Sequence, residues 1–299
     1  MRVFVTGASG WIGSAVVPEL VAAGHEVVGL ARSDASAAAV AALGAEVLRG
    51  SLDDPASLAE GAAVSDGVVH LGYNHDFARI SEAAQTDRLA IEAIGDALVG
   101  TDRPLVIAAG VLGLASGRPA TELDLPDPSL HPRIAGVQQA LAYADRGVRP
   151  VAVRFAPTVH GAGDHGFVAT LVAIARDRGF SGHIADGSNR WSAVPRVDAA
   201  HLVRLALEKG KAGSSVHAVA EEGVSTRAIA EAIGAGLAVP VVSIPVEQAA
   251  DHFGWIARFF GADAMASNAI TREQLGWEPT HAGLLEDLAV GHYFSTQAS

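Results

Sequence analysis

The sequence contains no cysteine and few aromatic residues, and each shortage excludes a class of function. Without cysteine there is no disulfide, no thiolate nucleophile and no cysteine-bound zinc, and this composition suits a cytoplasmic protein. Aromatic residues make up 5 % of the 299 residues, too few for a surface on which nucleic-acid bases stack.

Long apolar runs and clusters of positive charge are also missing. No apolar run reaches the roughly 18 residues of a membrane-spanning helix, so we expect no membrane association. The chain opens on an apolar run and a turn, not on a signal-type segment, which argues against secretion. The formal net charge is −12 and there is no basic run, so nucleic acid is an unfavourable partner. We therefore expect a small-molecule substrate.

Short apolar runs alternate with longer helical patterns through the first two thirds of the chain. Seven runs are expected to form strands, at residues 2–6, 26–31, 46–48, 67–71, 105–109, 151–155 and 216–220. Helical patterns lie between them, at residues 12–23, 57–61, 82–98 and 137–144. This alternation predicts an α/β fold of the Rossmann type, a doubly wound parallel sheet covered on both faces.

The texture of the sequence changes after Phe155. Segments 157–165 and 186–195 are rich in Gly, Pro, His and Asp, which is typical of loops. Residues 198–207 and 225–234 have helical patterns, and Thr271-x-x-Gln274 has the form of a capping box at a helix start. We expect a dinucleotide-binding domain over 1–158, to which 195–220 return. A small, mostly C-terminal substrate lobe would comprise 159–194 and 221–299.

A glycine-rich turn, TGASGWIG, follows the first expected strand. Gly7 permits a tight turn, Gly10 lets the backbone approach a pyrophosphate, and Gly13 lets the next helix pack closely on the sheet. The helix N-terminus then offers free N–H groups and a partial positive charge to the phosphates. The turn predicts cofactor contacts at Gly7, Ser9, Gly10, Trp11, Ile12 and Gly13.

The end of the second expected strand bears on which dinucleotide binds. Arg32 stands where an arginine accommodates the 2′-phosphate of NADP, and the Ser33 hydroxyl is beside it. These residues favour NADP. In the alternative interpretation, Arg32 is a solvated strand end and Asp34 holds the ribose of NAD.

The glycine turn resembles that of the extended short-chain dehydrogenases/reductases, the epimerase/dehydratase superfamily. Four further segments match in order: Ser51-Leu52-Asp53-Asp54, Val69-His70-Leu71-Gly72, residues 154–161, and Leu275-Gly276-Trp277-Glu278-Pro279. The first departs from the family pattern, because Ser51 stands where Asp is usual. The resemblance implies further cofactor contacts at Ser51, Leu52, Leu71, Gly72, Pro157 and Val159. It also implies that a homodimer is an option, with residues 82–98 as a contact.

The family's catalytic set does not match. Relatives use a Ser or Thr after the fifth strand and Tyr-x-x-x-Lys on the next helix, whereas this strand ends Ile107-Ala108-Ala109-Gly110. One register places Ser129 and Arg133 at the Tyr and Lys positions, and another places His131 and Ala135 there. The chain thus resembles an atypical subgroup that keeps the nucleotide turn. Arg133 is a candidate to replace the lost cation against the cofactor ribose.

Other polar clusters could supply the proton that carbonyl reduction needs. Tyr73-Asn74-His75-Asp76 follows the fourth expected strand, so Tyr73 could donate directly and His75 could relay a proton. A loop with solvated side chains is the alternative for this segment. His160 stands where relatives have a Tyr beside the nicotinamide.

Three further features bear on substrate binding and on other kinds of chemistry. Arg190 and Trp191, in 186–191, could hold and wall a substrate, or form a rim ion pair and a packed indole. His160, Asp164 and His165 have no metal-ligand spacing, so we expect no metal site. No G-x-S-x-G elbow supports a serine hydrolase.

These features together predict an NADP(H)-dependent oxidoreductase, with NAD as the other possible cofactor. It would act on a small carbonyl, imine or alcohol with a proton donor at Tyr73, His75 or His160. The alternatives are a non-catalytic NADP(H)-binding regulator and an epimerase or dehydratase that holds NAD.

Overall fold

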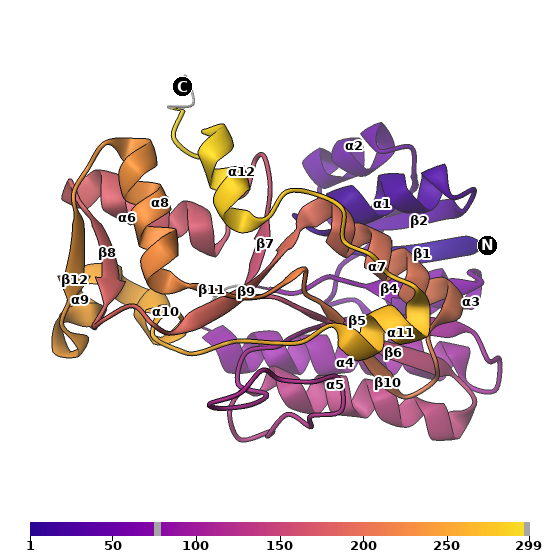
Figure 1. The fold of residues 1–299 in the computed structure, drawn as a ribbon. Helices are drawn as coiled ribbons and strands as arrows, with labels where there is room; N and C mark the ends of the chain where they lie inside the picture. Colours follow the sequence, from indigo (N-terminus) through magenta and orange to yellow (C-terminus); the bar gives the residue numbers. More distant parts are fainter. Residues whose placement is uncertain (75–78, 296–299) are drawn as a thin grey trace.

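The structure, a computed structural model, describes residues 1–74 and 79–295. Its centre is a seven-stranded sheet in which every neighbouring pair is parallel, in the order β10-β6-β5-β4-β1-β2-β3 (Figure 1). The strands are β1 Arg2–Thr6, β2 Glu26–Ala31, β3 Glu46–Arg49, β4 Gly67–His70, β5 Pro104–Gly110, β6 Arg149–Phe155 and β10 Ser214–Ala218. The predicted α/β fold and its seven strands are confirmed.

The strand order fixes where a ligand can bind. The chain builds outward from β1 to β3 on one side and from β4 to β10 on the other. Loops after β1 and β4 therefore leave the sheet in opposite directions, and α/β proteins bind ligands at such a point. The glycine turn follows β1, and Tyr73 follows β4.

Helices cover both faces of this sheet, which is why its central strands are largely apolar (Figure 1). On one face lie α1 Gly13–Ala22, α2 Asp34–Ala42 and α7 Arg196–Lys209. On the other lie α3 Pro55–Ala63, α4 Ile80–Leu98 and α5 Arg133–Ala142, followed by the short 3₁₀ helix η2 Tyr143–Arg146. In β1, Val3, Phe4 and Val5 are fully buried between the two helical layers.

A third hydrophobic cluster, separate from those on the two faces of the sheet, fills the smaller part of the molecule, on the left in Figure 1. Its strands are β7 Thr158–His160, β9 Arg190–Pro195 and β11 Glu221–Ser225 in one sheet, and β8 Ser181–Ile184 with β12 Val241–Ile244 in another. Its helices are α6 Phe167–Arg178, α8 Thr226–Leu237, η3 Val246–Gln248, α9 Ala249–Phe253, η4 Gly254–Ile256, α10 Ala257–Phe260 and α12 Leu284–Val290. The division at 1–158 with 195–220, and 159–194 with 221–299, stays a prediction.

Two local predictions are wrong. The segments read as loops contain β7 and β9, because Trp191, Ala193 and Val194 are buried and pair with neighbouring strands. The capping box at Thr271 does not form, since α11, Ala269–Leu275, already begins two residues earlier. The Thr271 hydroxyl instead donates to the buried carboxylate of Glu122, at 2.6 Å.

None of the helices in the described ranges, 1–74 and 79–295, has the length and apolar character needed to cross a membrane.

Candidate active site

The glycine turn lies against the end of β4. Gly7 has a φ of +68°, and a Cβ there would lie 2.7 Å from the backbone nitrogen of Gly72. A Cβ on Gly13 would lie 2.0 Å from the carbonyl oxygen of Gly7. Only glycine fits at either position, and the bare backbone leaves a cradle at the start of α1 of the kind that holds a pyrophosphate. The residues present fit a dinucleotide.

Trp11 fastens this turn to the segment around β7. The indole Nε1–H donates to the carbonyl oxygen of Val159 at 2.8 Å. The guanidinium of Arg196, at the start of α7, lies 4.0 Å from the centre of the Trp11 ring system, and the His165 ring stands roughly perpendicular to that ring system with ring centres 5.5 Å apart. The sequence singled out Trp11 and Val159, and the structure brings them together.

The residues expected to select between NADP and NAD lie after β2. Arg32 is exposed. The Ser33 hydroxyl caps α2 by accepting the Ser36 backbone N–H at 3.2 Å. The Asp34 carboxylate pairs with Arg49 at 2.9 Å. Arg32 and Arg49 thus bring positive charge to this strand end, and the Asp34 carboxylate is already paired with Arg49.

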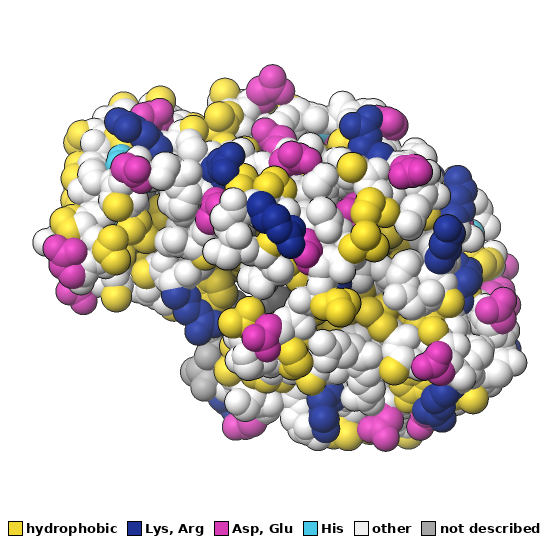
Figure 2. Space-filling view, turned by 60° about the horizontal axis from the view of Figure 1, so that its bottom comes forward, with side chains coloured by type: hydrophobic (Ala, Val, Ile, Leu, Met, Phe, Trp, Pro, Cys, Tyr) yellow, Lys and Arg dark blue, Asp and Glu magenta, His cyan; other side chains and the backbone are white. Residues whose placement is uncertain are grey.

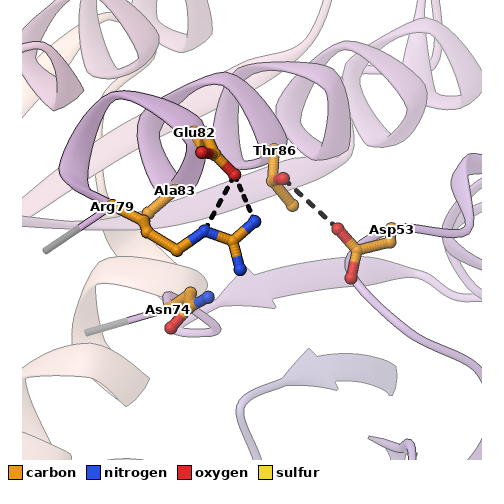
Figure 3. Close-up of a pocket in the computed structure, with 6 residues that line it drawn as sticks. All are labelled: Asp53, Asn74, Arg79, Glu82, Ala83 and Thr86. Carbon is orange, nitrogen blue, oxygen red and sulfur yellow. Dashed lines mark hydrogen bonds and ion pairs between the residues drawn. The ribbon is translucent and has the colours of Figure 1, made fainter. Parts of the chain in front are cut away.

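A cavity of about 200 Å³ lies between the loop after β3 and the start of α4 (Figure 3). Thr86 donates to the Asp53 carboxylate at 3.3 Å across it, and Arg79 pairs with Glu82 on its helical side. Ser51 donates to Asp53 as well, at 3.3 Å. Leu52 lies beside Gly72: a Cβ on Gly72 would come within 3.0 Å of the Leu52 Cδ2 atom. The segment of residues 51–54, in which the resemblance implies cofactor contacts, therefore borders a cavity.

A buried polar chain connects β1, β4 and α4. The Gly72 N–H donates to the Thr6 hydroxyl at 3.1 Å, and that hydroxyl lies 2.8 Å from His70 Nδ1. His70 Nε2 lies 3.1 Å from the Asp87 carboxylate. Since Asp87 can only accept, His70 carries its proton on Nε2 and Thr6 donates to Nδ1. The side chains of Thr6, His70 and Asp87 are almost fully buried.

Arg133 connects this series of buried polar side chains to Tyr73. Its Nε lies 3.5 Å from Asp87 Oδ2, and its Nη2 donates to the Ala108 carbonyl oxygen at 3.1 Å, at the end of β5. The guanidinium carbon lies 4.0 Å from the centre of the Tyr73 ring. Burial works to raise the pKa of Asp87, but the His70 hydrogen bond and the Arg133 charge outweigh it and hold that pKa below its usual value.

Tyr73 stands in a half-buried position under this guanidinium. Burial raises the pKa of Tyr73; the charge of Arg133 opposes this rise and that of Asp87 adds to it. The phenol is therefore protonated at neutral pH, as a proton donor must be. His75, the other candidate of this segment, lies outside the described residues.

His160 belongs to a different cluster, between β7 and α12. It is 1 % exposed, and its Nδ1 lies 3.0 Å from the Asp287 carboxylate. Nearby, Asp164 accepts from the Tyr293 hydroxyl at 2.8 Å and from the Gly166 N–H at 2.7 Å. Burial raises the pKa of Asp164. No contact between His160 and Tyr73 occurs in the part of the chain that the structure describes.

The remaining candidates divide between site and core. Trp191 is fully buried, and its indole donates to the Phe259 carbonyl oxygen at 3.1 Å, so it packs in the core. The backbone N–H of Arg133 donates to His131 Nδ1 at 3.1 Å, which places His131 beside the Tyr73 site. Within residues 1–74 and 79–295, no group of His, Asp or Glu side chains has the geometry to hold a metal ion.

Asp87 was not among the residues predicted from the sequence, although the pattern of α4 indicates that its side chain is buried. On α4 the buried face carries Ala83, Ala84, Ala90 and Ile91, and Asp87 falls at the same helical spacing. A carboxylate in an apolar stripe needs a buried partner. Its partners, His70 and Arg133, are both on other elements.

The chain resembles a known protein family and several individual proteins in sequence. The model of the NAD dependent epimerase/dehydratase family matches residues 3–220. An uncharacterized protein of Schizosaccharomyces pombe is 47 % identical over 98 % of this chain and 100 % of its own length. One of Saccharomyces cerevisiae is 46 % identical over 98 % and 99 %. The 4-hydroxy-2-methyl-3-oxo-4-farnesyl-3,4-dihydroquinoline-1-oxide ketoreductase of Stigmatella aurantiaca is 30 % identical over 71 % of this chain and 66 % of its own.

Solved structures share the fold at low sequence identity. Pal from Bacillus thuringiensis superposes with a TM-score of 0.78 at 19 % identity, covering 98 % of both chains. The UDP-glucose 4-epimerase of Thermus thermophilus, in complex with NAD, gives 0.74 at 22 % identity, covering 98 % of this chain and 99 % of that one. From its sequence match and its sheet, this chain belongs to the NAD dependent epimerase/dehydratase family.

Proposed function

We propose that this chain is an NADP(H)-dependent oxidoreductase that reduces a carbonyl or imine of a small molecule, with Tyr73 as proton donor. The observation that carries the proposal is the stack of Arg133 on Tyr73, 4.0 Å apart, at the sheet edge beside the glycine turn. The family supplies the Tyr and its cation from one helix. Here the two come from different elements, the loop after β4 and the start of α5.

The cradle after β1 supports a bound dinucleotide. Gly7, Gly10 and Gly13 would let the phosphates approach the backbone, and exposed Arg32 would meet a 2′-phosphate. When bound, the nicotinamide group supplies the hydride. The protein holds it in place and provides the proton.

Tyr73 would donate its hydroxyl proton to the substrate oxygen as negative charge develops there. The positive charge of Arg133 would then stabilise the tyrosinate that remains. Arg133 does not titrate as a Lys does, so its part is electrostatic. Asp87 and the Ala108 carbonyl fix the guanidinium from the opposite side, and His70 fixes Asp87.

Two other assignments remain part of the proposal. His75 follows Tyr73 in the sequence and is the candidate to return the proton from solvent. His160 stands on β7, next to Val159 and close to Pro157, which would flank the nicotinamide. The sequence likeness to a ketoreductase of Stigmatella aurantiaca supports reduction of a ketone as the reaction class.

Turnover of a ketone and imine panel with NADPH and NADH tests this function. We expect oxidation of NADPH with at least one carbonyl class, and a larger kcat/KM for NADPH than for NADH. Arg32→Ala should bring the two values together, whereas Arg227→Ala, on α8, should leave their ratio unchanged. Binding of NADPH without turnover of any panel member would contradict the enzyme assignment. Equal kcat/KM values in the unmodified chain would contradict the NADP assignment alone.

A further inference from the structure

Arg258, on α10, is a positive charge that the proposed reaction does not use. Its guanidinium carbon lies 4.5 Å from the centre of the Phe259 ring, and its side chain is exposed. Among the carboxylates of the described residues, none lies within ion-pair distance of it. An exposed guanidinium without a carboxylate partner is a group that can bind an anion.

His131 connects Arg258 to the Tyr73 site. The ring accepts the Arg133 backbone N–H at Nδ1, so its own proton is on Nε2 and is available to donate. Burial and the positive charges of Arg133 and Arg258 lower the pKa of His131, which keeps the ring neutral at neutral pH. Two hydrogen-bond donors, the Arg258 guanidinium and His131 Nε2–H, are therefore electrostatically coupled, and His131 is itself hydrogen-bonded to Arg133.

An aromatic wall adjoins these donors. Phe167 lies 5.4 Å from Phe259 and 5.7 Å from Trp255, ring centre to ring centre, and Trp255 is 47 % exposed. Leu112, two residues after β5, packs against the same cluster. The hydrophobic cluster of the smaller part, against which Phe167 and Phe259 pack, thus extends to the residues that follow β5, the strand whose Ala108 carbonyl holds Arg133.

The molecular surface is hollowed between its larger and smaller parts (Figure 2). Hydrophobic side chains line the rim of this hollow, and basic side chains lie beside it (Figure 2). An elongated molecule that is apolar in its middle and negative at one end matches these surroundings.

We propose that the substrate is a keto acid whose carboxylate binds to Arg258 and His131, with an apolar or aromatic body against Phe167 and Trp255. This inference rests on the function proposed above, because it places the carbonyl group toward Tyr73. Arg is suited to the task, since its planar guanidinium pairs two N–H groups with a carboxylate. A charge-assisted hydrogen bond shifts a binding equilibrium by roughly tenfold to a hundredfold.

The kinetic test compares keto acids with their neutral esters. Benzoylformate, phenylpyruvate and benzoylpropionate would be assayed with NADPH beside the methyl ester of each. We expect a KM about tenfold or more lower for at least one acid than for its ester. Arg258→Gln should remove that difference by raising the KM of the acid alone, and Arg258→Lys should restore part of it. Arg227→Gln, an exposed arginine of the same lobe, is the matched control. Equal effects of Arg258→Gln on acid and ester would overturn the inference.

A binding test separates this inference from the proposed function. Calorimetry of the NADP⁺ complex would compare phenylacetate and phenylpropionate, which have no ketone, with the corresponding amides. Tighter binding of the acids that is lost in Arg258→Gln supports the carboxylate site even if no ketone is reduced. Reduction of neutral ketones without any preference for acids in either assay would leave the oxidoreductase standing and overturn the keto acid.

Discussion

Asp87 is the residue around which the polar side chains beneath the sheet edge are arranged. It is 2 % exposed, and it accepts from His70 on one oxygen while facing Arg133 with the other. A buried carboxylate is costly unless both oxygens are satisfied, so each partner is needed. Through Arg133, Asp87 sets the electrostatic surroundings of Tyr73. It is a positioning residue and does not itself meet the substrate.

Replacing Asp87 should change the acidity of Tyr73. The negative charge of Asp87 raises the pKa of Tyr73, and that of Arg133 opposes the rise. Asp87→Asn removes the first effect and keeps the second, so the Tyr73 pKa should fall. The chain has three tyrosines, so ultraviolet titration in a Tyr143→Phe, Tyr293→Phe background reports Tyr73 alone. An unchanged or higher pKa in Asp87→Asn would contradict the proposed coupling.

At this scale, the sequence identified some residues of the site but not their contacts. Tyr73 and Arg133 were both candidates, because one follows a predicted strand and the other stands at the family's Lys position. Their stacking depends on how α5 packs beside β5 and α4, which no local pattern encodes. Asp87 was not predicted from the sequence, because its role depends on His70 and Arg133, which lie on other elements.

The elements of the molecule were more predictable, because most carry a local signature. The glycine turn shows this well, since Gly7 and Gly13 each have a steric reason in the structure. The central strands of the large sheet contain apolar runs, which matches their burial on both faces. β7 and β9 were not foreseen, because a Pro- and Gly-rich segment becomes a strand only through pairing with a distant partner.

The glycine turn gives a steric prediction. Gly7→Ala would place a Cβ 2.7 Å from the Gly72 backbone, and it should weaken NADPH binding and destabilise the fold. Gly24 has a φ of +85° with nothing within 4 Å, so Gly24→Ala should cost only the backbone strain of about 1–2 kcal/mol. Calorimetric NADPH binding and urea unfolding of both variants make the comparison. NADPH affinity equal to that of the unmodified chain in Gly7→Ala would count against the cradle.

The start of α11 gives a second prediction at this scale. Thr271 accepts the His217 N–H and donates to buried Glu122, so Thr271→Ala leaves two buried polar groups short of a partner. We expect a loss of about 1–3 kcal/mol in the free energy of unfolding. Gln274→Ala should change it little, because no capping box forms. Urea unfolding measures both losses. Similar losses in the two variants would contradict this account and would indicate that Thr271 and Gln274 form a capping box.

At the scale of the whole molecule, the described residues form three hydrophobic clusters. Two clusters fill the faces of the large sheet, and the third fills the smaller part around α6, α8 and α12. The alternation of strands and helices predicted the large sheet, since consecutive elements pack locally there. How the smaller part folds back depends on pairing between distant segments, so its architecture could not be predicted. A homodimer through 82–98 stays a prediction.

Stability of the whole molecule should depend on pH through Asp87. Its folded pKa lies below the ordinary value of 3.8, so its contribution is fully present above that value and is lost as the pH falls through the folded pKa. Asp87→Asn should cost about 3–5 kcal/mol at neutral pH, because the largely buried Arg133 loses its anion. The difference from the unmodified chain should shrink below about pH 4.

Urea unfolding over a pH series measures this difference, with Asp145→Asn on the surface as control. A difference that stays constant down to acid pH would show that Asp87 contributes through packing and not through its charge.

The central claim is that Tyr73 donates the proton, and the direct measurement is kcat for NADPH-linked ketone reduction by Tyr73→Phe. The phenyl ring keeps the stack with Arg133, so the Kd for NADPH should stay unchanged while kcat falls about a hundredfold or more. Tyr143→Phe, whose hydroxyl contacts Asp96 away from this site, should retain full kcat. A kcat in Tyr73→Phe equal to that of Tyr143→Phe would contradict the account.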